Sequence, residues 1–352
     1  MRFGFFDQLP CASGFTEHQR YKDILAQIEL GDDLGFDTAW LGELHFSRAF
    51  SILADPLMVL AAAGQRTRRI RLGTAVALLP LHNPVKIIEE AATADILSDG
   101  RLEFGVGRGA FPLYYVGFDV PQEESRERFE EALDFILAAW KSEQFSFEGK
   151  YFRARDLCLI PRTLQVPHPP VRVAANSPET FPFAGRRGLP IFAAPLINPP
   201  ERLKAGLQAY REALPTSAEG DTALAFSVHV TTSRAQARQE TEPGLLRFLR
   251  EAGDRPQLRG VPPSARPHRA GPLRGCRERN GHLRRSRFLR RTGARPPARI
   301  RDGRVHLLFQ PGRDHGPCLG KAVDDVVRQG GHAALPVVRD QDSGLPRRPA
   351  RS

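Results

Sequence analysis

The sequence has few cysteines and no long apolar run. Its four cysteines, Cys11, Cys158, Cys276 and Cys318, are widely spaced and form no CxxC pair, which argues against a disulfide framework and a zinc site. We therefore expect free thiols and no metal. The chain also lacks an apolar run of about 18 residues and a basic-then-apolar leader after Met1. These absences predict a cytoplasmic protein with neither a membrane span nor a signal peptide.

Most of the chain has nearly balanced charges, and the positive excess lies in one segment. The formal net charge is +11, but residues 261–352 hold 21 of the 51 basic and 7 of the 40 acidic residues, so they carry +14 and residues 1–260 carry −3. This basic segment is rich in Arg and Pro, and Ile300 is its only isoleucine. Such a composition buries too little apolar surface to offset chain entropy. We expect a folded domain over 1–257 and a disordered tail over 258–352.

Residues 1–253 alternate short β-branched or aromatic runs with amphipathic helical segments, a pattern that predicts βα units around a parallel sheet. The first helix is expected to begin near Glu17 and to end at Gly35. Segment 145–170 carries four prolines and no helical period, so it should leave the sheet. Seven strands are predicted, over residues 2–7, 38–43, 70–79, 102–106, 171–175, 190–194 and 223–231.

Seven βα units with right-handed crossovers favour an α/β fold of the (β/α)8 TIM-type barrel class, although the repeat alone leaves a doubly wound open sheet as the alternative. The eighth unit should follow Gly253, where the basic tail begins instead. We therefore expect an incomplete barrel in which this unit is missing or replaced. The first and seventh strands would then have unpaired edges.

Candidate catalytic residues follow the second strand, because active sites of α/β barrels lie at the carboxyl ends of their strands. Glu43 and His45 stand two apart in the run WLGELHF, so both can point into the barrel mouth. His45 could serve there as a general base or hydrogen-bond donor. The alternative is that both side chains only satisfy backbone groups.

Glycines and one arginine follow the fourth strand, in Gly105-Val-Gly107-Arg108-Gly109. The glycine spacing is two and two, so the dinucleotide-binding fingerprint is absent. Gly107 would let a ligand approach the backbone, and the planar cation of Arg108 suits a phosphate. A tight turn with a solvated arginine is the alternative.

The run from Asn176 to Thr180 after the fifth strand has the pattern of a helix start. Ser177 is expected as the N-cap, Pro178 at the first helical position and Thr180 at the third. The amides of such a start, with the hydroxyls of Ser177 and Thr180, favour an anion. An ordinary capped helix explains the same letters.

Four motifs in order resemble the bacterial luciferase-like flavin-dependent monooxygenase family. They are ELHF (43–46), LGTAVALLPLHNPVKIIEE (72–90), DGRLEFGVGRG (99–109) and VAANSPET (173–180) followed by AGRRGLP (184–190). The resemblance covers about residues 1–255. It implies a TIM-type barrel that binds reduced FMN delivered by a separate flavin reductase, and that uses dioxygen to oxygenate a small organic substrate. A homodimer is compatible with it.

The resemblance also implies roles for individual residues. By position in the motifs, Arg108, Ser177 and Thr180 correspond to flavin-phosphate ligands, with Gly107 and Asn176 beside them. Residues 74–76 fall where the family often carries a non-prolyl cis peptide under the flavin ring. Ala75 and Val76 are therefore expected to contact the cofactor.

One residue departs from the luciferases themselves, which have two consecutive histidines in the ELHF motif. The first, implicated in catalysis, aligns with Leu44, which cannot transfer a proton. Either His45 or His82, in the loop after the third strand, takes that role, or the reaction needs less base assistance. Light emission is therefore not expected. Asn176 replaces an acid that luciferases carry beside the phosphate, which removes one negative charge there.

Three other functions stay open. A deazaflavin-dependent oxidoreductase of the same superfamily would transfer hydride without oxygen, and Leu44 would suit a non-catalytic flavin-binding protein. The charge of the tail suggests nucleic-acid binding. Because Phe288 and Phe309 are its only aromatic residues, however, base stacking is poorly supported and nucleic acid is not an expected partner.

A shifted reading frame would explain the tail. Residues 310–315 require the codons CAR CCN GGN CGN GAY CAY, and moving on one base permits Asn-Pro-Gly-Gly-Ile-Met, which resembles the segment that family members carry at their last strand. Enrichment in Arg and Pro is what a GC-rich gene yields out of frame. We therefore hypothesise that the tail is a frameshift product, which resequencing of the gene across codons 250–265 and 305–330 would test.

Overall fold

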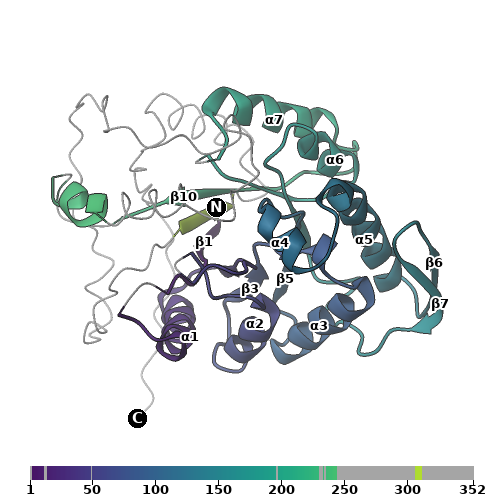
Figure 1. Cartoon of the computed structure of the whole chain (residues 1–352), viewed down its shortest axis with the longest axis horizontal. Coiled ribbons are helices and arrows are strands. Elements are labelled where there is room, and N and C mark those ends of the chain that lie inside the picture. The colour runs from purple at the N-terminus through teal and green to yellow at the C-terminus, as the bar shows by residue number, and fades with distance from the viewer. Residues whose placement is uncertain are drawn as a thin grey trace, which may run out of the picture.

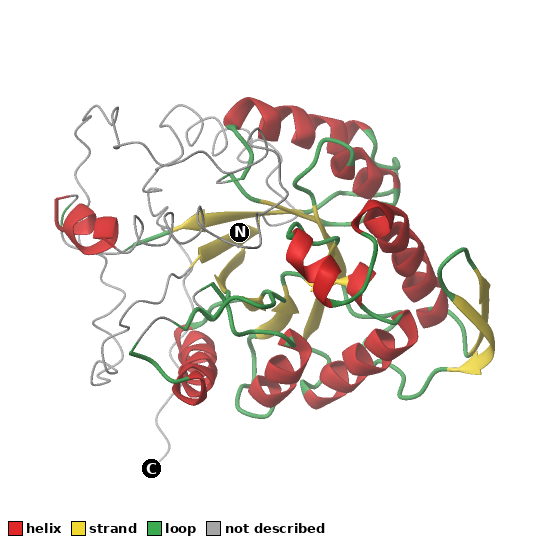
Figure 2. Ribbon diagram, viewed as in Figure 1, coloured by secondary structure: helices red, strands yellow, loops and turns green. Residues whose placement is uncertain are grey.

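A computed structural model describes residues 2–11, 14–48, 50–195, 197–229, 233, 235–243 and 306–310. Its centre is a mostly parallel sheet surrounded by helices α1, α2, α3, α5, α6 and α7 (Figures 1 and 2). The strands of the sheet are β1 (Arg2–Asp7), β2 (Thr38–Leu41), β3 (Arg71–Thr74), β4 (Ala77–Leu78), β5 (Leu102–Gly107), β8 (Val171–Ala174), β9 (Ile191–Ala193), β10 (Thr222–Ser227) and β11 (His306–Gln310).

The helices follow the strands in alternation, as the sequence pattern predicts. They are α1 (Glu17–Leu34), α2 (Pro56–Gly64), α3 (Pro84–Leu97), α4 (Pro112–Gly117), α5 (Ser125–Trp140), α6 (Thr180–Arg186) and α7 (Pro200–Glu212), with 3₁₀ turns η1 (Leu79–Leu81) and η2 (Gln122–Glu124). Residues 235–243 are also helical. The predicted ends of α1 are confirmed: the Thr16 side chain caps its start, and Gly35, at φ +82°, ends it in the left-handed conformation that glycine adopts readily.

The sheet closes into a barrel because β3 pairs with both β2 and β5. This closure confirms the TIM-type prediction and excludes the doubly wound open sheet. The seven predicted strands are all present, although the third is divided into β3 and β4 by residues 75–76. Segment 145–170 leaves the barrel as predicted. It contains an antiparallel hairpin, β6 (Gln144–Glu148) with β7 (Arg153–Cys158), which packs on α5 through contacts of Phe135 with Phe145 and Phe147.

The eighth position of the barrel is occupied by β11, which runs antiparallel to both of its neighbours. Leu308 lies opposite Gly4 of β1 and Ala225 of β10. The expectation that β1 and β10 have unpaired edges is therefore wrong, because a row of free N–H and C=O groups accepts any extended segment that reaches it. The eighth βα unit is thus replaced in the sheet by an antiparallel strand. Within the segment 258–352, for which disorder is predicted, the structure describes only β11, which is a strand. The rest of the segment and the predicted boundary at residue 257 lie outside the described residues.

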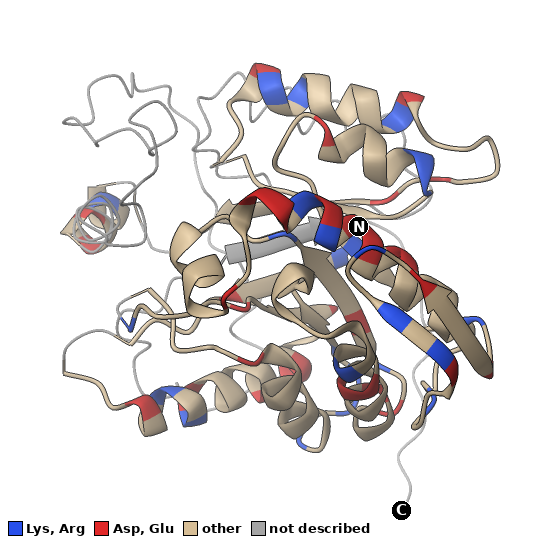
Figure 3. Ribbon diagram, turned by 45° about the vertical axis from the view of Figure 1, so that its right-hand side comes forward, with Lys and Arg blue, Asp and Glu red and all other residues tan. Residues whose placement is uncertain are grey.

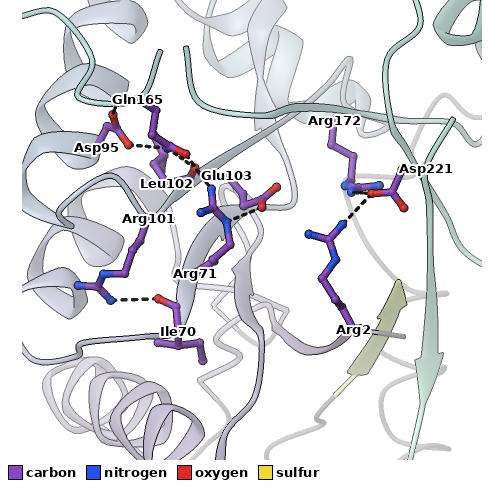
Figure 4. Close-up of polar contacts among 10 residues, drawn as sticks. All are labelled: Arg2, Ile70, Arg71, Asp95, Arg101, Leu102, Glu103, Gln165, Arg172 and Asp221. Atoms are coloured by element: carbon purple, nitrogen blue, oxygen red, sulfur yellow. Dashed lines mark hydrogen bonds and ion pairs between the residues drawn. The ribbon is translucent and has the colours of Figure 1, made fainter. Parts of the chain in front are cut away.

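Ion pairs close the amino-terminal end of the barrel (Figure 4). Arg172 Nη2 lies 2.5 Å and Arg2 Nη2 3.0 Å from the same carboxylate oxygen of Asp221, and Arg71 Nε lies 2.6 Å from Glu103 Oε1. In α/β barrels this end serves stability rather than chemistry. Among the described helices, none has the length and apolar character needed to span a bilayer.

Candidate active site

Glu43, His45 and His82 meet at the carboxyl ends of β2 and β4. The Glu43 carboxylate is buried, and its Oε1 lies 2.9 Å from Nε2 of both imidazoles. Its Oε2 lies 2.9 Å from His82 Nε2 and accepts the backbone N–H of Leu78 at 2.8 Å. The structure therefore brings together the three residues that the sequence analysis named as catalytic candidates.

Hydrogen bonding sets the charges of this cluster. Burial disfavours the carboxylate of Glu43, but hydrogen bonds from His45 and His82 outweigh it and hold the pKa of Glu43 below its usual value. Burial likewise opposes protonation of His82, yet its hydrogen bond and its attraction to Glu43 raise its pKa. Both shifts favour the pair of a His82 imidazolium with the Glu43 carboxylate. Within the described chain, no set of three His, Cys, Asp or Glu side chains could hold a metal.

Aromatic rings enclose His45. The ring centroids of Phe118, Tyr114 and Phe46 lie 4.8, 5.3 and 5.6 Å from that of His45, which is 8% exposed. The side chain of His82 is 28% exposed and is therefore the more open of the two histidines. Leu44 packs in an apolar cluster with Phe50, Leu78 and Tyr114, so it contributes bulk and no proton transfer.

Ala75 and Val76 are joined by a non-prolyl cis peptide, at the position that the resemblance implied. Both are half-buried between the buried ends of β3 and β4, and they pack against Trp40 and Phe192 inside the barrel. A Cβ added to Gly107 would collide with Val76 Cγ2. Gly107 thus makes room for Val76, a packing reason that the sequence did not reveal.

Arg108 follows β5 with an exposed side chain. Its carbonyl accepts a hydrogen bond from the hydroxyl of Tyr115, a buried residue of α4. The parallel register of β5 and β8 pairs Val106 with Val173, so Arg108 leaves the sheet beside the strand that leads to Asn176. No sequence pattern pointed to Tyr115.

Ser177 and Thr180 lie together, with their hydroxyl oxygens 2.9 Å apart. The predicted helix start is wrong by two residues, since α6 begins at Thr180 after Glu179 and has no side-chain cap. Ser177 does not cap the helix because its hydroxyl pairs with that of Thr180, while its carbonyl accepts the Thr180 amide in a turn. Pro178 therefore precedes the helix.

Asn176 is held by two residues that follow β9. Its side-chain oxygen accepts from Asn198 at 3.2 Å and its carbonyl from Arg202 at 3.3 Å. Glu179 stands nearby on the surface. Hydrogen bonds, including one from Ser177, and the cations Arg126 and Arg202 lower its pKa. Asn176 stands where luciferases carry an acid, and the carboxylate of Glu179 lies close to the same strand end.

Asp7, at the carboxyl end of β1, is a further buried acid that the sequence did not single out. Burial raises its pKa to about 6, although the amide of Leu9 donates to its Oδ1. Its position beside Leu41 of β2 brings it to the same end of the barrel as the Glu43 cluster.

The family model of luciferase-like monooxygenases matches residues 1–304. The chain belongs to this family. The match confirms the resemblance and continues to residue 304, so the expectation that the resemblance ends at about residue 255 is wrong.

Relatives of known activity are similar to part of this sequence. It is 32% identical over 200 residues to the oxygenase component of the flavin-dependent trigonelline monooxygenase of Acinetobacter baylyi, covering 56% of this chain and 55% of that protein. The crystal structure of the monooxygenase RslO1 from Streptomyces bottropensis superposes with a TM-score of 0.67 at 31% identity, over 71% of this chain and 78% of the other.

A more distant structure is similar in fold. The oxygenating constituent of 3,6-diketocamphane monooxygenase from Pseudomonas putida, in complex with FMN, has a TM-score of 0.58 at 22% identity, over 71% of this chain and 74% of the other. The chain matches only 52% to 55% of the length of three of its curated relatives, the trigonelline enzyme among them.

Proposed function

We propose that the chain is the oxygenase of a flavin-dependent monooxygenase that uses reduced FMN and dioxygen on a small organic substrate. The observation that carries the proposal is the Glu43–His45–His82 cluster at the carboxyl end of a barrel of this family. The apolar residues Ala75 and Val76 follow β3 at the same end. The trigonelline enzyme is named an oxygenase component, which supports a separate flavin reductase as a partner here.

The residues present fit an FMN. Ala75 and Val76 offer a partly exposed, uncharged surface suited to a flat ring system. Arg108 carries an exposed guanidinium, and such a cation binds phosphate with paired donors. The hydroxyls of Ser177 and Thr180 lie at the neighbouring strand end and can join it. When bound, the reduced flavin would supply the activation of dioxygen.

The protein's own contribution is the handling of protons. His82 and His45 both direct Nε2 toward Glu43, so Nδ1 is the atom at which each ring can exchange a proton with a substrate. Glu43 fixes the orientation of both rings and favours the imidazolium of His82. The rings around His45 exclude water, which strengthens these interactions.

Oxygen uptake tests the proposal. Purified chain supplied with reduced FMN should consume dioxygen in a substrate-dependent way across a panel of small aldehydes, ketones and aromatic compounds. A deazaflavin-dependent enzyme would instead reduce or oxidise substrate anaerobically with the deazaflavin. Flavin binding without substrate-dependent uptake would support the non-catalytic alternative, for which Leu44 is the motivating residue.

The phosphate role of Arg108 predicts a change in flavin affinity. Arg108→Ala should weaken FMN binding by about 1.5 to 3 kcal/mol, the scale of a charge-assisted hydrogen bond, and should leave riboflavin binding nearly unchanged. Tyr115→Phe removes the hydroxyl that holds the Arg108 carbonyl and should have a smaller effect in the same direction. Fluorescence titration with both flavins measures each affinity.

Riboflavin is the control, because it has the same ring system without the phosphate. Equal FMN affinity in wild type and Arg108→Ala would remove Arg108 from the phosphate site. If the double variant lost no more affinity than Arg108→Ala, Tyr115 would act through Arg108.

A further inference from the structure

Phe46 has an unusual backbone conformation beside His45. Its φ is +60°, in the left-handed region that bulky residues rarely adopt, and its side chain is 55% exposed. Strained residues of this kind persist mainly where the surrounding structure needs them, which makes them candidates for a functional role.

The Phe46 ring belongs to the aromatic group around His45. Its centroid lies 5.6 Å from His45, 5.9 Å from Phe118 and 6.2 Å from Tyr114. Tyr114 is buried, whereas Phe118 is 38% exposed and Phe46 is more exposed still. Phe46 and Phe118 are therefore the two rings of this group that separate His45 from solvent.

Gly117, the last residue of α4, makes room for the Phe46 ring. A Cβ at this position would lie 2.6 Å from Phe46 Cζ, closer than carbon atoms can approach. The backbone of Gly117 does not require glycine, because its φ lies outside the positive range, and alanine is the better helix former. The missing side chain therefore serves the position of Phe46.

Helix α4 adds an apolar surface beside these rings. Helix α4 has no charged residue and is tan throughout in Figure 3, and its Val116 is 77% exposed. An uncharged apolar group could cover α4 favourably, whereas a charged group would lose hydration there and gain no charged partner from the helix.

We propose that Phe46, seated against Gly117, gates access to His45 and contacts an uncharged apolar group of the substrate, so that the residue at 117 helps determine substrate size. The inference rests on the proposed function only in calling the incoming group a substrate. The gate itself concerns the accessibility of His45, which can be measured without flavin or oxygen.

Modification by diethyl pyrocarbonate, followed residue by residue with mass spectrometry on the full chain, measures that accessibility. We expect His45 to react at least fivefold faster in Phe46→Ala than in wild type, and Gly117→Ala to raise the rate as well by displacing the ring. His82 in the same samples is the internal reference. Val116→Ala, on the same helix, is the matched control and should leave the His45 rate unchanged.

Two further arms keep the test decisive. Phe46→Gly fits the left-handed backbone and should be no less stable in thermal unfolding, so faster His45 modification in that variant is not a folding defect. In wild type, n-hexanol should slow the modification of His45, whereas hexanoate should not. Equal His45 rates in wild type and Phe46→Gly, or equal protection by hexanoate, would overturn the gate. Absence of flavin binding would overturn the proposed function and leave the gate standing.

Discussion

Replacing His45 with alanine should lower turnover by about 10² to 10⁴, the usual range for a general acid–base residue, and should change flavin affinity much less. Its ring is held by Glu43 and shielded by aromatic side chains, while the flavin-phosphate candidates lie at other strand ends. Stopped-flow measurement of product formation, together with flavin titration, separates the two effects.

His82→Ala is the matched control, because it removes the other imidazole bonded to Glu43 and leaves the His45–Glu43 contact in place. We expect a smaller loss of turnover from His82→Ala than from His45→Ala. A larger loss in His82→Ala than in His45→Ala would transfer the proton-transfer role to the more exposed histidine.

The pH profile adds a second readout of the same cluster. Burial opposes protonation of His82 and Glu43 outweighs it, so Glu43→Gln should lower the pKa of His82. If protonated His82 is required, the alkaline limb of the profile should move to lower pH in Glu43→Gln. An unmoved limb would show that His82 does not control it.

The periodic features of the fold were predictable because they are local. Strand β1 has the predicted bounds, and α1 starts and ends where its capping residues place it. Strand ends at the barrel mouth were less predictable: residues 42–43 leave β2, and 75–76 interrupt the third strand, because at this end of the barrel the chain leaves the sheet. Hydrophobic pattern contains no information on such departures.

The site was predictable in its members and not in its contacts. Spacing placed Glu43 and His45 on one face, but His82 reaches the same carboxylate from another strand end, through tertiary structure alone. Tyr115 and Asn198 gave no signal, since their roles arise from hydrogen bonds to Arg108 and Asn176. The helix start at Ser177 failed because a side-chain pair with Thr180 replaced the capping bond.

The eighth strand shows the limit of compositional reasoning. Arg and Pro enrichment gave no indication that residues 306–310 pair with β1 and β10. The shifted reading starts at Gln310, the last residue of β11, and the remainder of that segment lies outside the described residues. The frameshift therefore stays a hypothesis for resequencing.

Asp7→Asn should stabilise the protein at neutral pH by roughly 3 kcal/mol. Burial raises the pKa of Asp7 from 3.8 to about 6, which means that the folded state favours the neutral acid. One pKa unit corresponds to about 1.4 kcal/mol, so ionising this carboxyl above pH 6 costs the native state that amount. Asparagine removes the charge and keeps an oxygen for the Leu9 amide.

The sign of the pH dependence distinguishes this carboxyl from an ordinary one. Because the folded pKa lies above the unfolded value, the stability from Asp7 is fully present below about pH 4 and is lost as pH rises through about 6. Wild type and Asp7→Asn should therefore unfold at similar urea concentrations at pH 4, and should diverge up to about pH 7.

Asp32→Asn provides a control of opposite sign. Asp32 accepts backbone N–H bonds from Arg68, Arg69 and Ile70, and although burial opposes its ionisation, these bonds lower its pKa. Its contribution is present above about pH 4 and is lost as pH falls, so the asparagine variant should be less stable than wild type at pH 7. If Asp7→Asn were also less stable at pH 7, the Asp7 carboxylate would be stabilised by its surroundings. In that outcome Asp7 would contribute to stability, and its presence at the same end of the barrel as the Glu43 cluster would need no functional explanation.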